Sequence, residues 1–334
     1  MNKFDKILII RTDRIGDVVL TTPAIKALRH AYPVARISIL VAPATKDLVQ
    51  GNPYLNEVLV DERNGRHQGF MGFLRLVCDI RRRKFNAVFI FHTKRRYNLV
   101  CFLAGIPVRI GYKNEKYGFL LTHPVKDVRP KGEKHEAQYC LDVLKEVGIK
   151  AADLDFLIPT DKEAEIWANQ WLVSNGFHGG ELIAIHTGSS DPAKCWPARD
   201  FAKLIDFLQE RYYLKTVLIG SAQGTEHCGE IMRLTTRKPL DLTGKTSLAQ
   251  TVSLLRRCRL LISNDSGPVH IASAIDIHVI SLFMRNQPGI NPQRWRPLSD
   301  KGIYLFSPQG IEVQEVLDNV EKIFRKSHQE FFHW

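Results

Sequence analysis

The sequence contains no long hydrophobic run and no clustered cysteines. No apolar stretch reaches the ~18 residues needed to cross a bilayer as a helix, and the short run at residues 7–10 is followed at once by charged residues. We therefore expect neither a membrane span nor a secretory signal peptide. The six cysteines include no CxxC pair. This favours reduced thiols in a cytoplasmic protein over a disulfide scaffold or a cysteine metal site.

Acidic residues are in deficit, with 35 Asp and Glu against 47 Lys and Arg, a net charge of +12. A basic surface suits an anionic partner such as nucleic acid, an acidic membrane face or a phosphorylated substrate. The sequence has no helix-turn-helix, zinc-finger or RNA-binding aromatic motif. It also has no G-x-G-x-x-G fingerprint after the first predicted strand. These absences disfavour a standard nucleic-acid reader and a standard dinucleotide site.

What the sequence does contain is a regular alternation of short apolar strands and amphipathic helices. A strand at residues 6–10, a helix at 22–31 and a strand at 36–41 form a βαβ unit, which requires parallel strands. The alternation is interrupted between residues 148 and 160 and then resumes. We predict the α/β class, with doubly wound domains at 1–155 and 156–310 facing a central cleft, and a C-terminal helix within 311–334.

Two predicted strand-to-helix turns in the second half carry residues that suit a phosphate. Hydroxyls, a lysine and the free N–H groups at a helix start all favour bound anions. Ordinary capping of two α/β loops explains the same residue types, and the local spacing leaves both interpretations open. The residues in these turns are Ser189, Ser190, Lys194, Asp265, Ser266 and Gly267.

The loop after the first predicted strand carries alternating charges at Arg11, Asp13, Arg14 and Asp17. A carboxylate at the carboxyl edge of a parallel sheet is well placed to act as a general base. The alternative is that Asp17 only caps the following helix.

Taken together, five segments resemble motifs of the lipopolysaccharide heptosyltransferase family, family 9 of the glycosyltransferases, in the family's order. They are Arg11-Thr-Asp-Arg-Ile-Gly-Asp-Val-Val-Leu-Thr-Thr-Pro23, His186-Thr-Gly-Ser-Ser190, Lys194-x-Trp-Pro197, Leu242-Thr-Gly-Lys-Thr-Ser-Leu248 and Asp265-Ser-Gly-Pro-x-His270. The sequence departs from the family pattern at residues 284–288, where a Gly-Pro-Thr-like loop is usual. This departure leaves the donor sugar open.

The resemblance implies a GT-B fold, with the acceptor on the first domain and the nucleotide-sugar on the second. The implied reaction is inverting transfer of heptose from ADP-heptose to a lipopolysaccharide inner-core sugar, with Asp17 as general base. Lys194, the hydroxyls of Ser189 and Ser190 and the amides of residues 266–269 would stabilise the leaving diphosphate. With these groups on the diphosphate no metal is required, and no cofactor is implied because the ADP-sugar is itself a substrate.

The resemblance also implies further contacts. Asp265 would bind the donor sugar, His270 the phosphates, Glu226 the ribose, and Lys245 and Thr246 the adenine. The acceptor, an anionic lipid-linked glycan at the cytoplasmic face of the inner membrane, would meet Arg11, Asp13, Arg14, Arg95 and Arg96. The terminal helix would cross back to the first domain. Two rival hypotheses are a nucleotide-sugar epimerase of the same architecture and a basic nucleic-acid-binding protein.

Overall fold

The computed structural model describes residues 4–113, 115, 117–150, 153–177, 182–189 and 191–330, with side chains up to residue 325. The chain divides into two compact units, Met1–Pro159 and Thr160–Trp334. This division falls inside the stretch at 148–160 where the sequence loses periodicity, slightly later than the expected boundary after residue 155.

The first unit is built on a six-stranded sheet in the order β3-β2-β1-β4-β5-β6, with all neighbouring strands parallel. Its central strand β1 consists of buried aliphatic residues after Lys6, as a strand covered on both faces requires. The strands are β1 (Lys6–Ile10), β2 (Arg36–Val41), β3 (Glu57–Val60), β4 (Ala87–Ile90), β5 (Val108–Tyr112) and β6 (His123–Val125).

The helices of this unit follow from amphipathic patterns. In α2, Pro23 stands in the first turn and Ala24, Ile25 and Leu28 form the buried face. Helix α2 packs beside α5, and α3 packs beside α4. The helices are α1 (Ile15–Val19), α2 (Thr22–Ala31), α3 (Gly69–Arg83), α4 (Arg95–Leu103) and α5 (Glu136–Lys145), with 3-10 turns η1 (Pro43–Leu48), η2 (Gly118–Leu120) and η3 (Arg129–Lys131).

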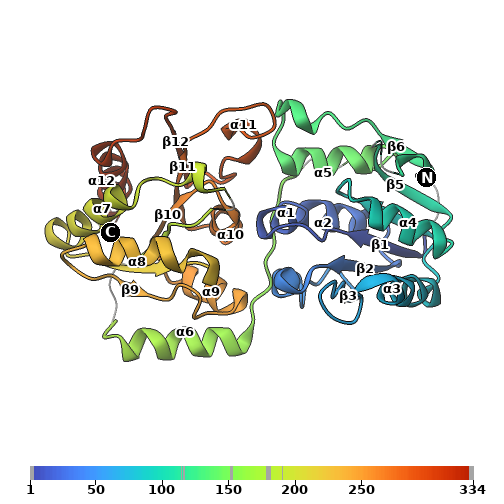
Figure 1. Cartoon of the computed structure of the whole chain (residues 1–334), viewed down its shortest axis with the longest axis horizontal. Coiled ribbons are helices and arrows are strands. Elements are labelled where there is room, and N and C mark those ends of the chain that lie inside the picture. The colour runs from blue at the N-terminus through green and yellow to red at the C-terminus, as the bar shows by residue number, and fades with distance from the viewer. Residues whose placement is uncertain are drawn as a thin grey trace. The chain divides into compact units, whose positions relative to one another are not determined.

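The second unit repeats the topology, with a parallel sheet in the order β12-β11-β10-β7-β8-β9. Strands β9, β10, β11 and β12 are labelled in Figure 1. Central strands β7 and β10 are wholly buried. The strands are β7 (Leu182–His186), β8 (Lys215–Ile219), β9 (Leu240–Asp241), β10 (Leu260–Asn264), β11 (His278–Phe283) and β12 (Gly302–Phe306).

Seven helices of the described residues accompany this second sheet. They are α6 (Lys162–Ser174), α7 (Ala198–Arg211), α8 (Thr225–Leu234), α9 (Leu248–Leu255), α10 (Gly267–Ala274), α11 (Pro292–Trp295) and α12 (Val313–Glu330), with 3-10 turns η4 (Pro192–Lys194) and η5 (Ala222–Gly224). Within the part of the chain that the structure describes, no helix has the length and apolarity of a membrane span.

The terminal helix α12 packs into the core of its own unit. Its side chains Val316, Leu317, Val320 and Ile323 belong to the buried cluster around Trp196. The apolar face of α12 is therefore used in the core of the second unit.

Candidate active site

In the first sheet, the strand order reverses between β1 and β4, which lie side by side. Ligands of doubly wound folds bind at the carboxyl edge of such a switch point. The loop after β1 supplies Arg11 and Asp13, and the loop after β4 supplies His92 and Lys94. The predicted first-loop residues therefore lie at the edge where the topology places a site.

Arg11 is the centre of a buried network at this edge. Its guanidinium is only 1% exposed, and Nη2 donates to Asp17 Oδ1 at 2.5 Å and to Glu136 Oε1 at 2.8 Å. A further hydrogen bond from Nη1 reaches the Phe91 carbonyl at the end of β4. Glu136, in the first turn of α5, is itself 1% exposed. Arg11 was predicted to bind the acceptor, but its described contacts hold Asp17 in place.

The Asp17 carboxylate is ion-paired with Arg11, and part of the side chain is exposed to solvent. It lies in the first turn of α1 and keeps 15% of its side-chain surface exposed. Burial raises the pKa of Asp17, the positive charge of Arg11 opposes that effect, and the negative charges of Asp13 and Glu136 add to it. A carboxylate with a raised pKa is a stronger base than an ordinary aspartate.

Asp13 lies beside this network with weaker contacts. Its Oδ2 is 3.8 Å from Arg11 Nε, and its Oδ1 is 3.8 Å from His92 Nε2 and 4.0 Å from Lys94 Nζ. Burial lowers the pKa of His92 well below its usual range, and the charges of Arg11 and Lys94 lower it further. His92 is therefore neutral at pH 7, while its Nε2 lies 3.2 Å from Thr12 Oγ1.

The other predicted acceptor residues differ in accessibility. Arg14 and Arg95 are exposed at the starts of α1 and α4. Arg96 instead donates to both Asp61 oxygens at 3.2 and 3.3 Å and to the His67 carbonyl at 3.1 Å. These contacts give Arg96 a structural role within the unit.

In the second sheet, the corresponding switch point lies between β7 and β10. Lys194, in turn η4, donates to Asp265 Oδ2 at 2.7 Å, and both side chains are mostly buried. Asn264 at the end of β10 accepts from the Trp196 amide at 2.9 Å and donates to the Thr187 carbonyl at 2.7 Å. The two predicted phosphate turns are thus joined at one sheet edge.

A buried histidine lies beneath these turns. His186 Nδ1 is 3.0 Å from Ser266 Oγ and 3.3 Å from Ser263 Oγ. Burial lowers its pKa to about 4, so the ring is neutral at physiological pH. A Cβ at Gly188 would lie 3.5 Å from His186 Nε2. The ring therefore forms part of the floor below the Gly188 loop.

The start of α10 offers fewer amides than the sequence suggested. Pro268 has no N–H, and the Val269 amide donates to the Ser266 carbonyl at 3.2 Å. The candidate phosphate donors at this helix start are therefore the amides of Ser266 and Gly267. His270 is 4% exposed, and its ring centroid lies 6.1 Å from that of Trp295.

The remaining predicted donor residues are more scattered. Glu226 is exposed in the first turn of α8. Lys245 donates to Asp241 Oδ2 at 3.1 Å, and Thr246 Oγ1 lies 2.9 Å from Thr251 Oγ1. Ser189 Oγ accepts from the Asp191 amide at 3.4 Å; Ser190 lies outside the described residues.

Sequence reasoning missed several residues that shape both edges. Glu136 lay within a predicted helix without being singled out. His92 and Lys94 follow β4, and a prediction that β1 and β4 are neighbours would have placed them beside Asp13. Asn264 directly precedes the predicted turn at Asp265, but a side chain that bridges two loops gives no local sequence signal.

The chain is similar to known proteins over most of its length. The family model for glycosyltransferase family 9 (heptosyltransferase) matches residues 73–320. Lipopolysaccharide heptosyltransferase 2 of Escherichia coli is 28% identical over 308 residues, which cover 89% of this chain and 86% of that protein. Two parallel doubly wound units give the chain the GT-B fold, and the family match makes it a glycosyltransferase. The chain belongs to glycosyltransferase family 9.

Solved structures share this fold over nearly the whole chain. A family 9 glycosyltransferase from Veillonella parvula matches with a TM-score of 0.87 and 24% identity, covering 96% of this chain and 97% of that one. The E. coli ADP-heptose lps heptosyltransferase II matches with a TM-score of 0.80 and 21% identity, covering 97% and 99%. The family assignment favours sugar transfer over the rival epimerase and nucleic-acid hypotheses.

Proposed function

We propose that the chain is an inverting heptosyltransferase that moves heptose from ADP-heptose to a sugar of the lipopolysaccharide inner core. Its curated relatives include lipopolysaccharide heptosyltransferases, and the name of one similar solved enzyme specifies ADP-heptose. The observation that carries the mechanism is Asp17 at the carboxyl edge of β1, whose carboxylate is held by Arg11 while 15% of its side-chain surface stays exposed. The protein would occupy the cytoplasmic side of the inner membrane, where such acceptors are made.

In this mechanism Asp17 accepts the proton of the attacking acceptor hydroxyl. The oxygen forms its bond to the anomeric carbon while the bond from that carbon to the diphosphate breaks, and attack opposite the leaving group inverts the configuration. The hydroxyl becomes acidic only as its new bond forms, so a carboxylate suffices as base. Arg11 fixes the carboxylate orientation, and the raised pKa of Asp17 increases its basicity.

The second unit would hold the donor through the Lys194–Asp265 pair and the start of α10. Lys194 would neutralise the leaving diphosphate, with the amides of Ser266 and Gly267 as donors, because preorganised positive groups stabilise developing charge. Asp265, released from Lys194, would accept hydrogen bonds from the sugar. We further propose the following donor contacts: Ser189 and Ser190 with the diphosphate, His270 near it, Glu226 with the ribose, and Lys245 and Thr246 near the adenine.

On the acceptor side, we propose that the exposed cations Arg14 and Arg95 bind anionic groups of the glycan, with Lys94 adding a third charge. Lys94 Nζ donates to the Thr12 carbonyl at 2.9 Å, so it is oriented toward the β1 loop. Asp13 would orient the acceptor by accepting from a hydroxyl. Arg11 and Arg96 would support the site without touching the acceptor.

The test is Asp17→Asn, which keeps the shape of the side chain and removes its charge. We expect kcat to fall by at least ~100-fold, the lower end of general-base contributions, while the affinity for ADP is unchanged because the proposed donor residues belong to the other unit. Steady-state transfer from ADP-heptose to a heptose-deficient lipopolysaccharide measures the first quantity, and calorimetry with ADP the second.

The matched control is Asp13→Asn in the same loop. We expect a smaller loss for this variant, because Asp13 lacks the short contact to Arg11 that orients Asp17. Near-native kcat in Asp17→Asn together with an inactive Asp13→Asn would move the base to Asp13. Full activity in both variants would refute the mechanism.

A further inference from the structure

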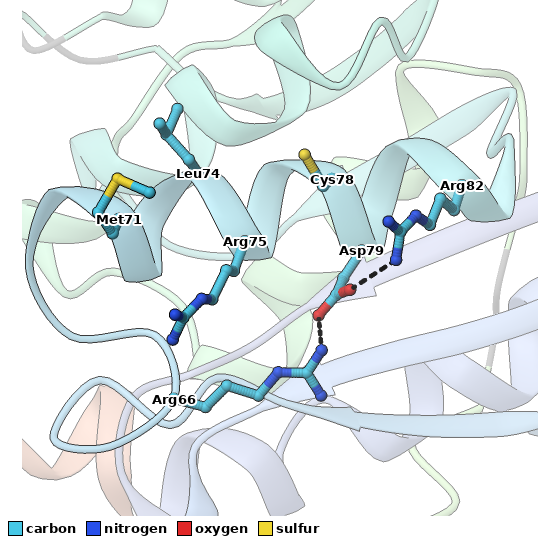
Figure 2. A pocket seen from close by; sticks show the side chains of 7 residues that line it. All are labelled: Arg66, Met71, Leu74, Arg75, Cys78, Asp79 and Arg82. Atoms are coloured by element: carbon cyan, nitrogen blue, oxygen red, sulfur yellow. Dashed lines mark hydrogen bonds and ion pairs between the residues drawn. The ribbon is translucent and has the colours of Figure 1, made fainter.

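The outer face of α3 carries a hollow of about 460 Å³ whose lining residues belong to neither sheet-edge site. Figure 2 shows the helix with the side chains that line it, one of which comes from the preceding loop. The lining residues are Arg66, Met71, Leu74, Arg75, Cys78, Asp79 and Arg82. The hollow therefore combines guanidinium groups with apolar side chains.

The charge of this hollow is positive, with three arginines around one aspartate. Asp79 accepts from Arg66 at 2.8 Å and lies 4.0 Å from Arg82 (Figure 2). Arg75 forms no ion pair with any residue that the structure describes. Arg66 and Arg82 are 59% and 81% exposed. Arg81 and Lys84 add exposed cations at the end of the same helix. The surface is thus suited to an anion-rich partner.

Large apolar side chains are exposed on the same group of elements. Phe70 and Met71, at the start of α3, are 74% and 64% exposed. Helix α4 packs beside α3, and η2 packs beside α4. Their side chains Phe102 and Phe119 are 48% and 79% exposed. Phe70 and Met71 precede Leu74 and Arg75 by one helical turn, so these exposed apolar side chains lie beside the positive charge of the hollow and mark an interaction surface.

We propose that this α3 surface docks the protein on the surface of an anionic phospholipid bilayer. Its arginines meet the lipid phosphates, while Phe70 and Met71 enter the boundary between headgroups and acyl chains. Exposed Met and Phe at the rim favour a bilayer over nucleic acid, whose backbone offers no apolar layer for them. The proposal rests on the proposed function in one respect, namely that a lipid-linked acceptor gives membrane docking its purpose.

The experiment is co-sedimentation of the full chain with vesicles of phosphatidylcholine and with vesicles of phosphatidylcholine and phosphatidylglycerol in equal parts. We expect binding to the anionic vesicles only. Arg75→Gln combined with Arg82→Gln should weaken that binding roughly 30-fold, from the usual electrostatic contribution of basic residues at an anionic membrane surface. Phe70→Ser combined with Met71→Ser should weaken it while leaving its salt dependence in place.

Two control pairs lie in the second unit. Arg199→Gln with Arg325→Gln removes equal charge at positions 76% and 82% exposed, and Val173→Ser with Tyr213→Ser removes side chains 62% and 86% exposed. Both pairs should bind vesicles like the wild type. Equal binding to neutral vesicles, or equal losses in α3 and control variants, would overturn the proposal. The proposal would also be overturned if duplex DNA displaced the protein from anionic vesicles and the Phe70 and Met71 substitutions left vesicle binding unchanged.

This outcome is separable from that of the proposed function. Transfer to a water-soluble, delipidated acceptor should be unchanged in the α3 variants, because none of these residues belongs to the proposed site. Transfer to an acceptor embedded in anionic vesicles should fall with vesicle affinity. An inactive wild type that still binds anionic vesicles through α3 would refute the proposed function and leave the docking surface standing.

Discussion

Glu136 acts on both members of the Arg11–Asp17 ion pair. Its negative charge raises the pKa of Asp17, and it also takes one of the hydrogen bonds of Arg11. Glu136→Gln keeps an acceptor for Arg11 but removes the charge. The pKa of Asp17 should then fall, and the acidic limb of the kcat–pH profile should move to lower pH, because the base stays deprotonated further into acid. The plateau rate should fall modestly with the weaker base.

The matched control for this change is Glu133→Gln, a 66% exposed glutamate three positions earlier in the chain. Its pH profile should overlay that of the wild type. If Glu136→Gln is folded, as judged by its thermal midpoint, and its acidic limb lies at the wild-type pH, then the charge of Glu136 does not influence the pKa of the catalytic base.

Lys194 is the corresponding residue of the proposed donor site. Its side chain is 15% exposed and its Nζ lies 2.7 Å from Asp265 Oδ2, so the ammonium is already oriented in the absence of ligand. Lys194→Ala should weaken ADP binding by roughly 1.5–3 kcal/mol, the range for a charged hydrogen bond. Calorimetric titration with ADP measures this loss. Lys203→Ala, which removes a 65% exposed lysine from α7, should bind ADP normally. Unchanged ADP affinity in Lys194→Ala would remove it from the site.

At the scale of elements, the ends of β7 and β10 are held together by His186. The pKa of this histidine falls from 6.5 to about 4 on folding because the ring is buried. Between these values the unfolded chain binds more protons than the folded one, so stability rises with pH across this window and is lost as pH falls through it. The full contribution is about 3 kcal/mol at 1.36 kcal/mol for each unit of pKa.

His186→Gln should flatten this dependence. Denaturant unfolding between pH 4 and 6.5 should show a smaller loss of stability in the variant than in the wild type. His30→Gln, at an exposed position on α2, should retain the wild-type slope. Identical slopes in wild type and His186→Gln would show that another group, such as buried His92, dominates acid destabilisation.

The sequence predicted the strongly periodic elements well and the short or edge elements poorly. Strands β1 and β2 and helix α2 were predicted at their observed bounds, because buried aliphatic runs and amphipathic spacing are local signals. Strands β6, β9 and β12 were missed. All three lie toward sheet edges, and β6 contains Pro124 and is only partly buried. The two-domain α/β prediction was confirmed, and with it the GT-B class.

Candidate site residues could be predicted where a polar or charged side chain directly follows a strand in the sequence. Contacts between residues of distant segments could not be predicted in this way. Asp17, Lys194 and Asp265 could be singled out from their turns. Arg11 donates to Glu136, which lies 125 positions away in the chain, so no local sequence pattern could predict this contact. Trp196, in one of the family-like motifs, is a packing residue: it is completely buried, and its indole N–H donates to the Ile311 carbonyl.

At the scale of the whole molecule, the core and the proposed donor site of the second unit are both contained in one stretch of chain. The buried cluster from Ile183 to Ile323 draws only on residues after Thr160. The Lys194–Asp265 pair and the His186 network lie within the same stretch. We therefore predict that Thr160–Trp334, expressed alone, folds cooperatively and binds ADP with an affinity close to that of the whole chain.

Met1–Pro159, expressed alone, should fold around its own cluster at β1, β4, α3 and α4 without binding ADP, and neither piece should transfer sugar. Lys194→Ala within the isolated second unit is the internal control and should lose ADP binding as in the full chain. Thermal shift with ADP is a direct readout, since a ligand at 100 times its Kd adds about 2.7 kcal/mol of stability. A folded second unit that fails to bind ADP would mean that residues of the first unit take part in donor binding, and the donor site proposed above would have to be extended to include them.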